Sequence, residues 1–174
     1  MPEILFVCTA NQFRSPIASA YFYQKLAETG RTDNWKITSA GTWTENGLPV
    51  HIEAEKAASR ISLDISRHKT REVNLSILST ADLIITMEQG HKEALTAEFP
   101  SCKDRIILLC QVAGEPVTEI EDPVIRNFEF CDMTVQSILF CIDRSFEKII
   151  NLAVSFYIER EKFEQKQSNM KSAT

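Results

Sequence analysis

The N-terminal stretch 4–16 restricts the fold of this chain more than any other part of the sequence. Residues 4–7 form a short continuous apolar run, which is typical of a strand buried on both faces of a sheet. Ser15 is a favourable helix N-cap and Pro16 suits the first helical position, so a helix is expected from about 16 to 29. The sequence therefore predicts a buried strand, a short loop and a helix within the first 30 residues.

Strands and helices are expected to alternate along the rest of the chain. Apolar runs predict further strands, and apolar residues at helical spacing predict helices between and after them. The expected strands are 35–39, 82–87 and 105–109, and the expected helices are 51–59, 74–78, 89–98 and one long helix after Pro123, with a loop at 110–127. This alternation predicts an α/β fold, a flavodoxin-like open four-stranded parallel sheet in the order 2-1-3-4 with helices on both faces. Ligands of such sheets bind at the carboxyl ends of the strands, where the first loop lies.

The composition is that of one globular domain. A chain of 174 residues with 44% hydrophobic and 25% charged residues can bury a substantial core, which we expect to span residues 1–161. Residues 162–174 are polar and are expected to form a flexible C-terminal tail. A net charge of -5 without a basic cluster disfavours nucleic acid as a partner. No apolar run is long enough for membrane insertion, and a signal peptide is not recognisable.

The five cysteines are widely spaced and include no C-x-x-C pair. They are Cys8, Cys102, Cys110, Cys131 and Cys141. An odd number at these spacings disfavours both a disulfide scaffold and a zinc site. We therefore expect a reducing, cytoplasmic location.

Cys8 and Arg14 are placed six positions apart in the loop that joins the first strand to the first helix. Backbone N–H groups at a helix N-terminus bind anions, and they favour the thiolate form of a cysteine beside them. The planar fork of Arg14 can hold two oxygens of a bound phosphate, and the Ser15 hydroxyl can donate to the thiolate sulfur. Such a loop is suited to nucleophilic attack on phosphorus. The structural alternative is a buried strand-end cysteine beside a surface arginine.

This segment resembles the phosphate-binding loop of the low-molecular-weight protein tyrosine phosphatase family, whose pattern is V-C-x-G-N-x-C-R-S-P near the N-terminus. Four later stretches are also similar to motifs of that family and follow in the same order. They are S-A-G-T at 39–42, H-K-T-R at 68–71, D-L-I-I-T-M-E at 82–88 and D-P at 122–123. The resemblance covers about residues 3 to 150.

The resemblance implies a two-step covalent phosphatase that works with no metal and no cofactor. It makes Cys8 the nucleophile and Arg14 the phosphate clamp, and it gives Ser15 the task of stabilising the thiolate. Asp122 would protonate the leaving oxygen and then activate water against the phosphocysteine, although Glu119 and Glu121 are nearby carboxyl groups that could compete. The phosphate-binding loop would consist of Thr9, Ala10, Asn11, Gln12, Phe13, Arg14 and Ser15.

Three polar residues are implied to support the shape of this loop. They are Asn11, Ser39 and His68, and the histidine would take no part in the chemistry. The other two histidines, His51 and His91, have the sequence surroundings of surface helix residues. Trp43 is interpreted either as a wall of the substrate pocket or as a partly buried core residue.

The implied function is hydrolysis of a phosphorylated protein side chain, most simply phosphotyrosine, or of a small aryl phosphate. Inorganic phosphate would be both product and inhibitor. Several positions depart from the family pattern. Ala10 replaces a glycine, and Phe13 replaces a second loop cysteine that protects the nucleophile by forming a reversible disulfide. Gln12 matches neither the isoleucine of tyrosine phosphatases nor the threonine of their phosphoarginine relatives, and Val124 and Ile125 stand where aromatic residues are frequent.

Two other functions remain open. Ala10 and Phe13 favour a pseudophosphatase that binds phosphate or a phosphoprotein without turnover. An arsenate reductase of related fold would need further cysteines to relay a disulfide from the nucleophile. The helix expected at 89–98 contains none, whereas Cys102 and Cys110 flank the expected fourth strand.

Overall fold

A single parallel sheet organises the protein. The computed structural model describes residues 1–114 and 119–172. The strands are β1 (Glu3–Cys8), β2 (Lys36–Gly41), β3 (Leu83–Thr86) and β4 (Ile106–Leu108), and their order across the sheet is β2-β1-β3-β4. All neighbouring strands run parallel. The predicted open α/β sheet and its strand order are confirmed.

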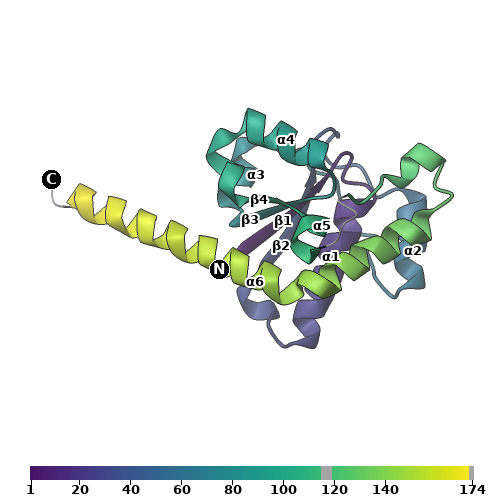
Figure 1. Cartoon of the computed structure of the whole chain (residues 1–174), viewed down its shortest axis with the longest axis horizontal. Helices are drawn as coiled ribbons and strands as arrows, with labels where there is room; N and C mark the ends of the chain where they lie inside the picture. Colours follow the sequence, from purple (N-terminus) through teal and green to yellow (C-terminus); the bar gives the residue numbers. More distant parts are fainter. Residues whose placement is uncertain (115–118, 173–174) are drawn as a thin grey trace.

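Six α-helices and three short 3₁₀-helices connect and follow the strands in the described part of the chain (Figure 1). The α-helices are α1 (Arg14–Glu28), α2 (Ile52–Arg60), α3 (Leu75–Thr80), α4 (Gln89–Glu98), α5 (Leu109–Ala113) and α6 (Cys131–Ser172). The 3₁₀-helices are η1 (Thr32–Asn34), η2 (Pro100–Arg105) and η3 (Pro123–Arg126).

Helices cover both faces of the sheet because alternate side chains of β1 point in opposite directions. Ile4 and Phe6 join a core that includes buried residues of α1, α2, α5 and α6. Leu5 and Val7 join a smaller core with residues of α3 and α4. The central strands are thus buried on both faces, as their continuous apolar runs predicted.

Two local predictions were wrong. The segment 110–127 is not a loop throughout, because α5 and η3 lie within it; its residues 115–118 lie outside the described part of the chain. Ser15 is not the N-cap of α1, which begins at Arg14. The Ser15 hydroxyl instead faces the Cys8 sulfur, and Pro16 still lies in the first turn, where its missing N–H costs no hydrogen bond.

Helix α6 crosses the sheet and then extends beyond it (Figure 1). Arg160 fixes the helix to the sheet, since its Nε lies 2.9 Å from Oδ1 of the fully buried Asp82. The polar residues from 162 onward are helical as far as Ser172, and their flexibility stays a prediction, as does the domain boundary at 161. Among the described residues, no helix is both long and apolar enough to cross a membrane.

Candidate active site

Cys8 and Ser15 face each other across the loop between β1 and α1. The Cys8 residue ends β1 and is almost fully buried, and its Sγ lies 3.0 Å from the Ser15 Oγ. The Ser15 Oγ also accepts a hydrogen bond of 2.9 Å from the amide Nδ2 of Asn11. The serine hydroxyl hydrogen can point to the Cys8 sulfur or, at 3.4 Å, to the carbonyl oxygen of Ala40. A hydroxyl in this position can donate to a thiolate sulfur, which only accepts hydrogen bonds.

Asn11 organises the loop from its centre. It has a left-handed backbone, with φ 54°, and its side chain is fully buried. Its Nδ2 also donates to Ser39 Oγ at 2.9 Å, and its Oδ1 accepts from the backbone N–H of Arg71 at 3.0 Å. Asparagine tolerates this left-handed conformation better than most residues, which explains its use here.

His68 supports the loop from the backbone side. Its Nε2 lies 3.0 Å from the carbonyl oxygen of Asn11. Burial lowers the pKa of His68, so the ring is neutral near pH 7 and donates a single ring hydrogen to that carbonyl. The structure thus brings together the three residues predicted to support the loop, Asn11, Ser39 and His68.

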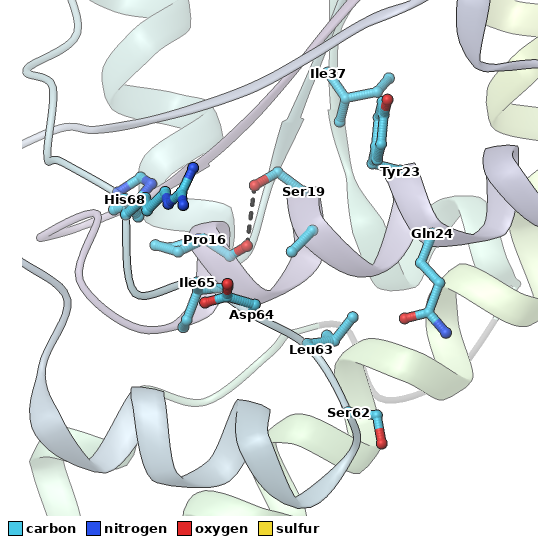
Figure 2. A pocket seen from close by; sticks show the side chains of 12 residues that line it. Pro16, Ser19, Tyr23, Gln24, Ile37, Ser62, Leu63, Asp64, Ile65 and His68 are labelled. Carbon is cyan, nitrogen blue, oxygen red and sulfur yellow. Dashed lines mark hydrogen bonds between the residues drawn. The ribbon is translucent and has the colours of Figure 1, made fainter.

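A cavity of about 560 Å³ lies between α1 and the connection that contains His68 (Figure 2). Residues of α1, including Pro16 and Ser19, form one wall, and the connection containing Asp64 and His68 forms another. Cys8 does not line it. This cavity therefore lies behind the loop rather than at the nucleophile.

Arg14 is held between two carboxylates, although its side chain is buried. Its Nη1 donates to Glu88 and, at 2.9 Å, to the carbonyl oxygen of Ile120. Its Nη2 donates to Asp122 Oδ2 at 2.5 Å and to Thr9 Oγ1 at 3.1 Å. These contacts fix the plane of the guanidinium, and the two carboxylates supply the negative charge that compensates a buried arginine.

Glu88 was not assigned a role from the sequence. It is the second residue after the end of β3, at the same edge of the sheet as Cys8, and it is the N-cap residue of α4. Its place after a buried parallel strand was the signal that could have identified it.

His91 is not a surface residue, so the prediction from its sequence surroundings was wrong. It is only 6% exposed, and its Nε2 lies 2.9 Å from Thr9 Oγ1. Burial lowers the pKa of His91, against the opposing charge of Glu88. Its Nδ1 has no hydrogen-bond partner among the described residues. The ring therefore packs in neutral form behind the phosphate-binding loop.

Asp122 contacts Arg14, whereas its two acidic neighbours in the sequence, Glu119 and Glu121, are engaged elsewhere. Glu119 Oε1 accepts from the backbone N–H of Gln89 at 2.9 Å. Glu121 pairs with Arg126 at 3.4 Å. The other oxygen of Asp122 caps η3 by accepting from the N–H of Val124. This cap fixes the carboxyl group at the mouth of the site.

A cavity above Cys8 is lined mainly by apolar and aromatic groups. Its walls comprise Cys8, Ala10, Gln12, Phe13, Arg14, His51, Asp122, Val124 and Phe128. The His51 ring stacks on Phe128 with centroids 3.9 Å apart, and Phe13 lies 6.2 Å from Phe128. Sequence reasoning missed the roles of His51 and Phe128 as walls, because the two residues are 77 positions apart and only the fold brings their rings together.

The departures at Ala10 and Gln12 have simple structural consequences. The left-handed position of the loop is Asn11, and Ala10 has no positive φ, so its backbone conformation accepts a Cβ. The Gln12 amide donates to the carbonyl oxygen of Pro49 at 2.9 Å. Trp43 is 79% exposed and lines a groove with Ala10 and Gln12, so its interpretation as a core residue was wrong.

Comparison with known proteins identifies the family. The family model described as low molecular weight phosphotyrosine protein phosphatase matches residues 3–153. The chain belongs to this family. The low molecular weight phosphotyrosine protein phosphatase of Rattus norvegicus is 30% identical over 150 residues, which cover 84% of this chain and 94% of the rat protein. A protein-arginine-phosphatase of Geobacillus stearothermophilus is 27% identical over 147 residues, which cover 84% of this chain and 95% of that protein.

A solved structure supports the same assignment. The low molecular weight protein tyrosine phosphatase from T. tengcongensis aligns with a TM-score of 0.78 and 31% identity, covering 85% of this chain and 99% of that one. The family resemblance and the class of enzyme predicted from the sequence, a cysteine-dependent phosphatase of low molecular weight, are confirmed. The roles of individual residues remain predictions, and the placement of Cys8, Arg14 and Asp122 around one cavity supports them.

Proposed function

We propose that this protein hydrolyses a phosphorylated protein side chain, most simply phosphotyrosine, through a phosphocysteine intermediate. The observation that carries the proposal is the convergence of the Cys8 thiol, the Arg14 guanidinium and the Asp122 carboxyl group on one cavity. A nucleophile, an anion clamp and a proton donor are the groups that this two-step reaction requires.

The reaction would use these groups in sequence. The Cys8 thiolate attacks phosphorus while Arg14 binds two of the phosphoryl oxygens, and Asp122 protonates the departing oxygen. The aspartate then takes a proton from water as that water attacks the phosphocysteine. Inorganic phosphate leaves as product and, because it fits the same loop, competes with substrate. Loop N–H groups and Arg14 stabilise the charge that develops on the phosphoryl oxygens.

Aromatic walls favour an aryl phosphate. Phe13 and Phe128 line the cavity beside Cys8, although Val124 and Ile125 occupy the positions that follow Asp122-Pro123. These rings offer apolar surface to a phenyl leaving group, which supports phosphotyrosine over phosphoarginine as substrate. A cytoplasmic location belongs to this proposal, because the reaction needs Cys8 as a reduced thiol.

Hydrolysis of an aryl phosphate at mildly acidic pH tests the proposal, with Cys8→Ser and Asp122→Asn compared with the native chain. Phosphotyrosine and phosphoarginine peptides assayed side by side test the preference. The expected result is turnover that Cys8→Ser abolishes and that is faster on phosphotyrosine. A native protein that binds vanadate but turns over no phosphorylated substrate would instead be a pseudophosphatase.

A further inference from the structure

A second pair of sulfur atoms lies apart from the phosphate-binding loop, between α5 and α6. Cys110 in α5 and Cys141 in α6 have Sγ atoms 3.2 Å apart, although 31 positions separate them in the sequence. Both residues are buried, with exposed fractions of 2% and 3%. A disulfide bond is about 2.05 Å long, so a small approach of the two side chains would join them.

Small molecules can approach this pair. Both cysteines line a cavity of about 410 Å³, together with Glu119, Ile120 and Phe140. The Phe140 side chain is half exposed, so this wall of the cavity reaches the surface of α6. An oxidant of the size of water or peroxide fits such a space.

The other cysteines have different surroundings. The Cys8 sulfur faces the hydroxyl of Ser15, and Phe13 occupies the loop position where the resembled family has its second cysteine. The Cys102 sulfur lies 3.4 Å from Nη2 of Arg105. Cys8 and Cys102 thus face a hydroxyl and a guanidinium, whereas Cys110 and Cys141 face each other.

We propose that Cys110 and Cys141 form a reversible intramolecular disulfide when a peroxide oxidises the protein. One sulfur attacks the O–O bond of hydrogen peroxide, giving a sulfenic acid, and the departing hydroxide takes the thiol proton and leaves as water. The second sulfur attacks the sulfenic sulfur and expels its hydroxyl group, which leaves as a second water with the second thiol proton. Two thiols thus lose two electrons, and one peroxide is reduced to two waters.

The bridge would enclose the segment that carries the proposed proton donor. Asp122 lies between the two cysteines in sequence, as does Ile120, whose carbonyl oxygen accepts from Arg14. Linking the ends of this segment restricts the unfolded chain, and so the bridged protein is expected to melt roughly 5–10 °C higher. The modification stabilises the site-bearing segment without involving the nucleophile.

The test uses the Cys8→Ser variant, so that oxidation of the nucleophile cannot contribute and turnover is not a readout. Hydrogen peroxide is added, and thiols are counted in denaturant before and after dithiothreitol. We expect the four remaining thiols to fall to two and to return on reduction. Mass spectrometry should find the peptides of Cys110 and Cys141 linked, and Tm should rise.

Two further variants in the same background provide the controls. Cys102→Ser should still form the bridge, because its sulfur lies elsewhere, whereas Cys110→Ser should show neither the linked peptides nor the rise in Tm. An unchanged thiol count, over-oxidation to sulfinic acids without a bridge, or a link between other sulfurs or between two chains would overturn the proposal. A bridged protein with unchanged Tm would overturn the stabilising effect.

Discussion

Nη2 of Arg14 lies 2.5 Å from Oδ2 of Asp122, so the proposed phosphate clamp and the proposed proton donor are paired with each other. A phosphate that enters the loop needs the same guanidinium N–H groups. Binding of the anion therefore has to displace Asp122 from Arg14, while Glu88 can keep the guanidinium in place. The displaced carboxyl group is then available for the leaving oxygen of the substrate.

Asp122→Asn should slow turnover and tighten anion binding. The amide cannot transfer a proton to the leaving group, so kcat on an aryl phosphate should fall by about 10²- to 10⁴-fold. The neutral amide also competes less strongly than a carboxylate with a bound anion for Arg14. Vanadate and phosphate should therefore inhibit at several-fold lower concentration. Steady-state kinetics with both inhibitors measure the two effects. Glu119→Gln, which removes a charge that does not contact Arg14, should change neither strongly, and weaker anion binding in Asp122→Asn would refute the competition.

Asn11→Ala should lower both stability and activity. The change removes two buried hydrogen bonds, to Ser15 and Ser39, and a partly buried one from the N–H of Arg71, and it places alanine in a left-handed conformation. We expect the free energy of unfolding to fall by about 2–4 kcal/mol, measured by urea denaturation. Asn11→Gly separates the two causes, because glycine accepts the backbone; it should recover about 1 kcal/mol of stability but little kcat. Equal stability of all three proteins would contradict this account.

Gly41→Ala should distort the phosphate-binding loop where it passes closest to β2. A Cβ at Gly41 would lie 2.6 Å from the carbonyl oxygen of Thr9 and 3.1 Å from the carbonyl carbon of Ala10, both backbone atoms. We expect a stability loss of about 1–3 kcal/mol and weaker vanadate binding. Gly90→Ala is the matched control, since nothing lies within 4 Å of its Cβ position in α4, and it should stabilise the protein by about 0.5–1 kcal/mol. Native vanadate affinity in Gly41→Ala would exclude a close fit there.

The protein should lose stability between pH 7.5 and 5.5. Burial lowers the pKa of both His68 and His91 in the folded state, whereas in the unfolded chain both titrate near the ordinary value of about 6.5. Below that value the unfolded state binds more protons, so the free energy of unfolding falls as the pH falls. Urea denaturation across this range measures the slope. The double variant His68→Gln/His91→Gln should show a smaller slope, and an equal slope would mean that these rings are not kept neutral by the fold.

Much of the fold could be predicted because local patterns were strong. The apolar run at 4–7 and its counterparts at 82–87 and 105–109 placed three strands, and the N-terminal loop identified Cys8 and Arg14. Prediction was weaker where contacts between distant segments decide the outcome. Ser15 does not cap α1, because its side chain is engaged by Cys8 and Asn11. His91 is buried because α4 packs against the loop at Thr9.

The sequence by itself determined the order of the four strands, the loop that begins at Cys8, and the family to which the chain belongs. Periodicity and short motifs are local properties of a chain. Only the tertiary structure decided which groups surround Arg14, that Phe128 rather than Val124 or Ile125 supplies an aromatic wall, and that Cys110 meets Cys141. These are contacts between segments far apart in the chain. Their geometry depends on how the helices pack over the sheet, which no local pattern encodes.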